Sequence, residues 1–226
     1  MSLRARQQEE KQERRNSIID AAERVLQDKD VESLTMADVA STARLSRSLM
    51  YVYFEDLDDI VLAVTLRGFE ALHDRFVEAA AAHATGLMQI RAIGEAYVQF
   101  AHEGPAYFDL LARFEARTTD PEEAATHEAQ CLAAGDRVIQ VMTDTVQAGI
   151  DDGSIRPSLD PMQTAITLWG YTHGLIQLST HKGSMLSRRH DIAPGSIVAN
   201  GLDFAGVALT GRCDEQAPDV PPDNLD

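Results

Sequence analysis

Apolar residues recur along most of this 226-residue chain at steps of three and four, which is the period of an amphipathic α-helix. The first such stripe is made of Ile18, Ile19, Ala22, Val25 and Leu26, which fall on one helical face. No clear run alternates apolar and polar residues in the way a half-buried strand does. The pattern therefore predicts an all-α fold of about nine helices.

Proline and glycine divide the chain beyond residue 56 into further helices. We expect a long helix from Asp56 to about Ala82. Proline suits the first turn of a helix, so further helices are expected to start at Gly104-Pro105, Asp120-Pro121 and Asp160-Pro161.

The C-terminal end of the chain is expected to change character twice. A polar loop with Arg188, Arg189 and His190 should be followed by a last helix over about 193–209. Residues 213–226 include three prolines and several acidic residues, a composition that predicts a disordered tail.

Two helix-start signals lie close together after the first apolar stripe. Thr35 suits an N-cap, and Asp38 three residues later can complete a capping box. Ser46 suits the cap of a following helix, which we expect to continue through Tyr53 and to be anchored inside by Leu49 and Phe54. Such a cap, turn and cap are typical of a helix-turn-helix, which places its second helix in the DNA major groove.

The formal net charge of −16 is distributed unevenly. Residues 1–50 hold nine basic and nine acidic residues, and five of the basic ones lie within the first fifteen residues, so the acidic excess belongs to the remaining chain. DNA phosphates would attract the basic N-terminal arm, where Arg14 and Arg15 can point outward to phosphates, and would repel the acidic body. An ordinary acidic protein with a solvated arm explains the same totals, and charge alone favours that simpler interpretation.

Residues 18–60 resemble the DNA-binding domain of the TetR family of bacterial transcriptional regulators. The matching residues are Ile18-Ile19, Ala21-Ala22, Leu34-Thr35-Met36, Val39-Ala40, Ala43, Leu45-Ser46, Tyr51, Tyr53-Phe54 and Asp58-Asp59-Ile60. The resemblance implies a DNA-contacting surface made of Thr35, Met36, Arg44, Leu45, Ser46, Arg47, Ser48, Tyr51 and Tyr53.

The residue types in this surface suggest different roles. Arg47 and Ser48 open the second helix, where side chains meet base edges, and arginine can donate two hydrogen bonds to guanine. The hydroxyls of Tyr51 and Tyr53 can reach phosphates, which sets register without reading sequence. For either tyrosine alone, a half-buried structural aromatic is the simpler interpretation.

Four positions depart from the family pattern. Asp30, Arg44 and Ser48 stand where glycines are usual, and Leu57 stands where a lysine often lies near a phosphate. If Arg44 adopts the left-handed conformation, a residue with a Cβ costs on the order of 1 kcal/mol there. These departures put one phosphate contact in question but leave the expected fold unchanged.

The pattern GSIRPSLDP followed by LWGYTHGLIQL resembles the C-terminal region of one TetR branch, with Trp169 and His173-Gly174 as its marks. This looser resemblance implies a small-molecule effector site and a homodimer through the last two helices. Plain core packing is the more frequent role for each single side chain of this kind. The candidate lining residues together form a mostly aromatic and apolar set with a few polar groups on predicted helices: Tyr97, Phe100, Phe108, Leu111, Phe114, Met142, Trp169, Tyr171, His173 and Gln177.

The sequence lacks the motifs that are typical of several other classes of protein. The chain has no phosphate loop, nucleophile elbow or zinc-protease motif, so we expect neither an enzyme nor a bound cofactor. Cys131 and Cys213 lack metal-ligand spacing, and no metal site is expected. No apolar run reaches the length of a membrane span and no secretory signal is evident, so we expect a cytoplasmic protein without a membrane partner.

These observations predict a ligand-responsive transcriptional regulator. It would act as a repressor, bind a palindromic operator in double-stranded DNA as a homodimer, and be released by a small-molecule effector. The expected organisation is a DNA-binding domain with its basic arm over 1–56, an effector-binding and dimerisation domain over 57–212, and a tail over 213–226. A helical structural or interaction protein without specific DNA binding is the alternative.

Overall fold

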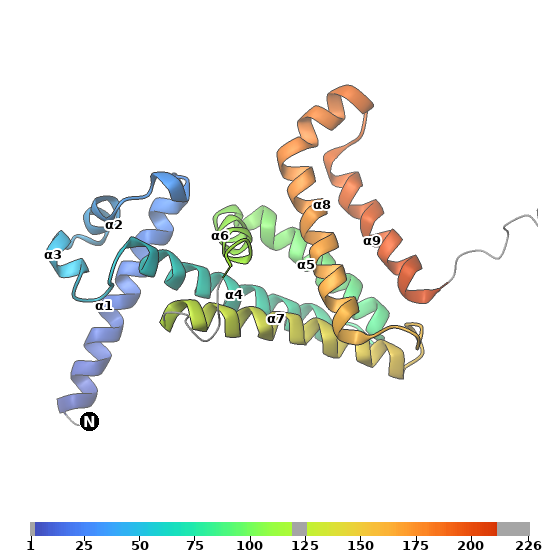
Figure 1. Cartoon of the computed structure of the whole chain (residues 1–226), viewed down its shortest axis with the longest axis horizontal. Helices are drawn as coiled ribbons and strands as arrows, with labels where there is room; N and C mark the ends of the chain where they lie inside the picture. Colours follow the sequence, from blue (N-terminus) through green and yellow to red (C-terminus); the bar gives the residue numbers. More distant parts are fainter. Residues whose placement is uncertain (1–2, 119–125, 212–226) are drawn as a thin grey trace, which may run out of the picture. The chain divides into compact units, whose positions relative to one another are not determined.

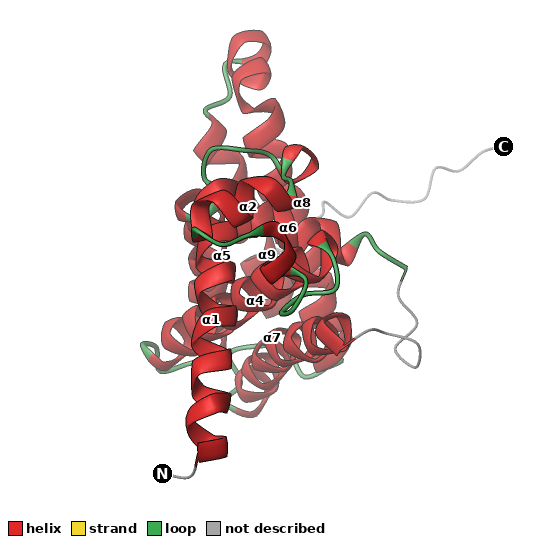
Figure 2. Cartoon of the chain, turned by 90° about the vertical axis from the view of Figure 1, so that its left-hand side faces the viewer, coloured by secondary structure: helices red, strands yellow, loops and turns green. Residues whose placement is uncertain are grey.

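The computed structural model describes residues 3–118 and 126–211, and within them every regular element is a helix (Figures 1 and 2). The α-helices have these bounds: α1 Leu3–Leu26, α2 Met36–Ala43, α3 Arg47–Met50, α4 Leu57–Ala81, α5 Gly86–Glu103, α6 Pro105–Glu115, α7 Thr126–Asp151, α8 Pro161–His190 and α9 Pro194–Thr210. A short 3₁₀ helix, η1, spans Val31–Ser33 between α1 and α2. The prediction of an all-α fold is confirmed.

Two local predictions are wrong. The expected polar loop at Arg188–His190 is the last turn of α8, where basic side chains complement the negative end of the helix dipole. The helix is closed by its C-cap residue Asp191, which has a left-handed backbone (φ 54°) and donates its N–H to the Ser187 carbonyl. The predicted helix start at Asp120-Pro121 and the predicted disordered tail 213–226 lie outside the described residues.

The second error concerns the short helix α3. It ends at Met50, and residues 51–53 form turns rather than a continued helix. Leu49, the expected anchor, is only partly buried, whereas Met50 is fully buried together with Phe54. A helix of one turn presents few side chains inward, and here Met50 takes the inward position.

The described chain packs as two compact units. The first contains residues up to 78 and residues 96–141, and the second contains residues 79–95 and the residues from 142 onward. Each helix that crosses a boundary (α4, α5 and α7) is continuous through it.

One apolar core runs through the first unit. It joins Ile18 of α1, Val39 of α2 and the buried pair Met50 and Phe54 to Val64 of α4, and it extends to Leu110 of α6. These side chains are almost completely buried. The three N-terminal helices therefore share a core with the first turns of α4 and with α6, rather than folding as a detached module.

The second unit is held by close backbone approaches. Asp152 accepts a hydrogen bond from the backbone N–H of Gly86 at 2.8 Å, which ties the start of α5 to the turn after α7. A Cβ on Gly86 would lie 2.2 Å from the backbone nitrogen of Gly149, so only glycine fits at that point. The helices α8 and α9 form a hairpin (Figure 1) in which a Cβ on Gly201 would meet Leu175 at 2.2 Å.

Taken singly, none of the helices in the described ranges is both long enough and apolar enough to cross a membrane. By length and composition alone, the bent pair of α8 and α9 meets that test, with an angle of 103° at its break.

Candidate functional site

The helix α2 begins with the capping box that the sequence predicts. Thr35 Oγ1 accepts a hydrogen bond from the Asp38 N–H at 3.2 Å, and Asp38 Oδ2 accepts one from the Thr35 N–H at 3.0 Å. Lys29 also contacts the Asp38 carboxylate at 2.8 Å. The hydrogen bonds from Lys29 and then Thr35 lower the pKa of Asp38, so the carboxylate that caps the helix stays ionised.

The turn between α2 and α3 uses Arg44 in the left-handed conformation, at φ 57° and ψ 39°. Its N–H closes the end of α2 on the carbonyls of Ala40 and Ser41, and the Leu45 N–H also donates to Ala40, at 2.9 Å. Arg44 therefore meets the condition considered from the sequence, and its Cβ carries the cost of the left-handed conformation. The Arg44 side chain is exposed, so the turn presents a cation to solvent.

The start of α3 is capped as predicted. Ser46 Oγ accepts a hydrogen bond from the Leu49 N–H at 3.2 Å and lies 3.1 Å from Ser48 Oγ. Arg47 and Ser48, the first two residues of α3, are exposed. The cap therefore presents a guanidinium and a hydroxyl on one short, rigid turn.

The nine predicted DNA-contacting residues do not all reach the surface. Thr35, Arg44, Ser46, Arg47 and Ser48 are exposed. Tyr51 is 50% exposed, whereas Leu45 and Tyr53 are half-buried. Met36 is only 5% exposed and belongs to the core, so a contact from its side chain to DNA is not compatible with the structure.

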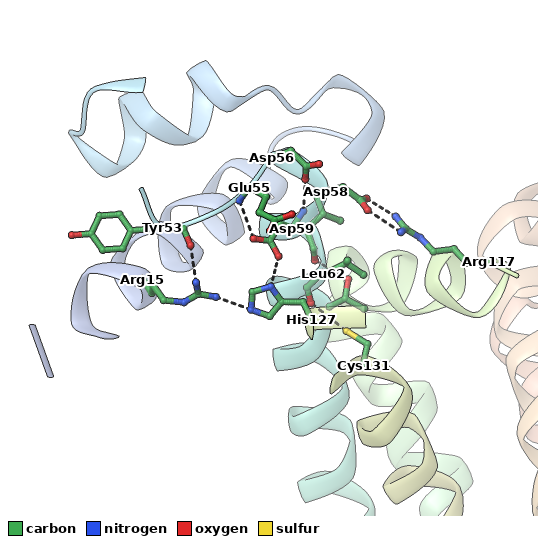
Figure 3. Close-up of polar contacts among 12 residues, drawn as sticks. Arg15, Tyr53, Glu55, Asp56, Asp58, Asp59, Leu62, Arg117, His127 and Cys131 are labelled. Atoms are coloured by element: carbon green, nitrogen blue, oxygen red, sulfur yellow. Dashed lines mark hydrogen bonds and ion pairs between the residues drawn. The ribbon is translucent and has the colours of Figure 1, made fainter. Parts of the chain in front are cut away.

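A polar network holds the end of this helix-turn-helix against α1, α4 and α7 (Figure 3). Arg15 of α1 donates to the Tyr53 carbonyl at 2.7 Å and lies 2.7 Å from His127 Nε2. The other ring nitrogen of His127 contacts Asp59 of α4, whose second oxygen accepts a hydrogen bond from the Glu55 N–H at 3.1 Å. The sequence suggested that Arg15 points outward to phosphate, but its guanidinium is engaged here.

Ion pairs and a thiol contact extend these connections to α6 and α7. Arg117, which follows α6, donates to both carboxylate oxygens of Asp58, at 2.9 and 2.5 Å, and lowers the pKa of that residue. Cys131 of α7 donates to the Leu62 carbonyl of α4 at 3.3 Å. Burial raises the pKa of the Cys131 thiol to about 12, which suits a packed thiol and not a nucleophile.

The residues predicted to line an effector site fall into two groups. Five of them lie in the core of the first unit: Tyr97, Phe100, Phe108, Leu111 and Phe114. Tyr97 packs edge-to-face on Phe76 with ring centroids 5.8 Å apart and contacts Phe108 at the same centroid distance. The rings of this group fill space against one another.

The second group lies in the second unit and is less buried. Trp169 and His173 contact each other with ring centroids 5.8 Å apart, and burial lowers the pKa of His173. Tyr171 is exposed, Gln177 is half-buried and Met142 is buried. The ten predicted residues are therefore divided between the two units.

A pocket of about 500 Å³ opens in the second unit among α5, α7, α8 and α9. Met142 is the one predicted effector residue in its lining. Its lining also includes Leu87, Ile90, Arg91, Gly94, Leu168 and Leu202. Arg91 pairs with Asp203 at 2.8 Å, so one ion pair borders a mostly apolar space.

One sequence signal marks the α5 wall of this pocket. Leu87, Ile90, Arg91 and Gly94 follow the spacing of one helical face, and a Cβ on Gly94 would lie 2.7 Å from Leu202. A stripe with a glycine and an arginine among apolar residues could have pointed to this face. The contribution of α9 could not have been found in this way, because it depends on how distant helices pack.

A second pocket, of about 410 Å³, lies in the first unit among η1, α4 and α6. Phe114 is the one predicted effector residue that lines it, together with Val61, Leu110 and two arginines, Arg113 and Arg117. Both arginines are paired with carboxylates, Arg113 with Glu32 and Asp109 and Arg117 with Asp58. In the part of the chain that the structure describes, no three His, Cys, Asp or Glu side chains are grouped closely enough to hold a metal ion.

Family models match both parts of the chain. The model described as bacterial regulatory proteins, tetR family, matches residues 18–64, which contain the capped helices and the turn. A second model, described as a tetracyclin repressor-like C-terminal domain, matches residues 90–193. An uncharacterized HTH-type transcriptional regulator from Mycobacterium tuberculosis is 24% identical over 179 residues, which are 76% of this chain and 68% of that protein.

Solved structures share the fold. A protein of unknown function from Rhodococcus sp. RHA1 aligns with a TM-score of 0.72 and 22% identity, covering 87% of this chain and 95% of that one. FadR from Bacillus subtilis, in complex with stearoyl-CoA, aligns with a TM-score of 0.63 and 16% identity, covering 86% and 97%. AibR, in complex with isovaleryl coenzyme A and operator DNA, aligns with a TM-score of 0.62 and 15% identity, covering 84% and 97%.

Proposed function

Since the chain belongs to the TetR family of bacterial regulatory proteins, whose members regulate transcription, we propose that it is a ligand-responsive repressor. It would bind a palindromic operator as a homodimer and leave it when a small-molecule effector binds. Operator DNA lies in the bacterial cytoplasm, so the proposal implies a cytoplasmic protein.

The observation that carries the DNA-binding part is the capped turn between α2 and α3. Its caps and its left-handed Arg44 hold Arg47 and Ser48 exposed at the start of α3. In a helix-turn-helix, this is the end of the second helix that meets base edges. Arg47 is therefore our candidate for reading a base, with Thr35, Arg44 and Tyr51 as candidates for the phosphate backbone.

Exposed apolar side chains on α8 and α9 support a homodimer through these helices. They are large residues that are 39–63% exposed in the single chain: Met162, Ile166, Tyr171 and Leu178 on α8, and Phe204 and Val207 on α9. Apolar patches of this kind are typical of protein interfaces. A two-fold dimer would present two α3 helices to successive half-sites of a palindrome.

For the effector we propose the pocket of the second unit. Its apolar lining and the Arg91–Asp203 pair suit a molecule with an apolar body and a polar group. Acyl-coenzyme A thioesters, which FadR and AibR bind, are one such class. The aromatic residues of the first unit would contribute only if their packed cluster opened. The helix α4 is our candidate lever between effector and DNA.

The test is a binding titration of the purified protein against duplex fragments from the region upstream of its own gene, at two salt concentrations. We expect one palindromic fragment to be preferred at both concentrations. Arg47→Ala should weaken binding to it by about 1–3 kcal/mol and reduce discrimination at the contacted base pair. Acyl-coenzyme A thioesters of several chain lengths would then be screened for release of the fragment.

Arg137→Ala is the matched control, because it removes an exposed arginine from α7 in the acidic body. It should bind as the wild type does. Weak binding to every fragment, lost at the higher salt concentration, would favour a helical interaction protein without sequence-specific DNA binding.

A further inference from the structure

His127 in the first turn of α7 is the central member of the network in Figure 3. Its side chain is only 13% exposed. One ring nitrogen faces Asp59 of α4 and the other lies 2.7 Å from Arg15 Nη2 of α1. The ring also stacks on Phe54, with centroids 6.1 Å apart and planes inclined by 25°.

The partners of His127 determine which nitrogen carries its proton. A guanidinium can only donate hydrogen bonds, so the Nε2 atom that faces Arg15 must be the acceptor. In a neutral imidazole the other nitrogen is then the donor, and Nδ1–H donates to the Asp59 carboxylate. An imidazolium would turn an N–H toward the N–H groups of Arg15 and lose that bond.

Arg15 passes this connection to the DNA-reading helices. Its second terminal nitrogen donates to the Tyr53 carbonyl at 2.7 Å, and its guanidinium carbon lies 4.5 Å from the centre of the Phe54 ring. Tyr53 and Phe54 follow α3 directly, and Phe54 is buried in the shared core. Arg15 therefore helps to fix the position of the residues that directly follow α3.

We propose that His127, as the Nδ1–H tautomer, is a positioning residue for operator binding: it bridges Asp59 and Arg15 and so makes the placement of α3 depend on the first turn of α7. The inference rests on the proposed DNA binding. If the first turn of α7 moves away, Arg15 loses one of its two hydrogen-bond acceptors, and its guanidinium is held less firmly at Tyr53. This gives the body of the protein a route to α3 that runs from α7 through Arg15 of α1, in addition to the route through α4.

Two variants separate the hydrogen bonds of His127 from its ring. His127→Phe keeps an aromatic ring against Phe54 but removes both hydrogen bonds. His127→Gln removes the ring but keeps an oxygen that can accept from Arg15 and an N–H that can donate to Asp59. We expect His127→Phe to weaken binding to the preferred duplex about tenfold, or about 1.4 kcal/mol, and His127→Gln to stay within about threefold of the wild type.

A double-mutant cycle and a spectrum test the bridge itself. Adding His127→Phe to Arg15→Leu should weaken operator binding little further, because the two residues act through one connection. In ¹⁵N-labelled free protein, the long-range ¹H–¹⁵N spectrum should show the Nδ1–H tautomer of His127, and Arg15→Leu should shift it toward a mixture of tautomers. A purely structural role would lower the melting temperature without this pattern.

The outcomes are distinguishable. The matched control is His102→Phe, at an exposed histidine of α5, and it should bind as the wild type does. If the wild type binds the preferred duplex and His127→Phe binds it equally well, the inference is overturned but the proposed function is not. The same holds if the spectrum shows the Nε2–H tautomer of His127. Absence of sequence-specific binding by the wild type overturns the proposed function, and the inference with it.

Discussion

Replacing Arg44 with glycine should stabilise the fold while weakening DNA binding. The left-handed backbone at φ 57° brings a Cβ close to the following carbonyl oxygen, which costs about 1–2 kcal/mol for residues other than glycine. Glycine removes this cost but adds conformational entropy to the unfolded chain, about 0.5–1 kcal/mol. The matched variant Arg44→Ala removes the same charge and keeps the Cβ.

The difference between these two variants isolates the strain from the loss of charge. We expect Arg44→Gly to be more stable than Arg44→Ala by about 1 kcal/mol, which corresponds to about 2–4 °C in melting temperature for a chain of this size. Urea and thermal unfolding followed by circular dichroism would measure it. Equal stabilities of the two variants would refute the argument that the turn is strained.

The same pair tests the role of the exposed guanidinium. If Arg44 contacts a phosphate, both variants should reduce the salt dependence of operator binding by about one unit in the slope of log K against log salt. Fluorescence anisotropy with the preferred duplex at several salt concentrations would measure this slope. An unchanged slope in both variants would place Arg44 away from the phosphates.

Three other predictions follow from the structure. The Lys29 ammonium and the Thr35 hydrogen bonds lower the pKa of Asp38. Asp38→Asn should therefore be less stable than the wild type above about pH 4, and this difference should vanish as the pH falls through the lowered folded-state pKa. Urea midpoints measured against pH would show this, and a difference that persists in strong acid would contradict it. Burial raises the pKa of the Cys131 thiol to about 12, so iodoacetamide at neutral pH should alkylate Cys131 slowly in native protein and quickly in denaturant. Mass spectrometry of the Cys131 peptide would measure this, and rapid alkylation of the native protein would count against a buried thiol. Phe204 on α9 is 63% exposed, so Phe204→Glu should shift the protein from dimer to monomer in analytical ultracentrifugation. The control Val77→Glu on α4 should stay dimeric. A Phe204→Glu variant that is still dimeric would exclude this face as the interface.

Local signals predicted the candidate DNA-reading unit well. The capping box of Thr35 and Asp38 and the cap at Ser46 are both present, and Arg44 between them has the left-handed conformation that the sequence left open. Each depends on residues within three or four positions of one another, and backbone hydrogen bonds at that range are set by the adjacent side chains. The sequence therefore carried enough information to place α2, the turn and the start of α3.

Predictions that needed distant contacts were less successful. The predicted effector residues are mostly aromatic or apolar side chains on helices, and such side chains line both close-packed cores and cavities. Tyr97 and Phe108 pack together in a core, whereas the pocket of the second unit is lined by α5 and α9 residues such as Leu87 and Leu202. Helix periodicity identifies an inward face but not what the face meets.

By itself, the sequence determined the helices, their caps and the family resemblance, because these depend on residue spacing over one or two turns. Only the tertiary structure decided the role of Arg15, which by its sequence position could point to phosphate but in the fold contacts Tyr53 and His127. Arg15 and His127 are 112 positions apart, so no local pattern relates them. Their contact exists because the packing of α1, α4 and α7 brings a donor and an acceptor together in a largely buried place, where polar groups must find partners.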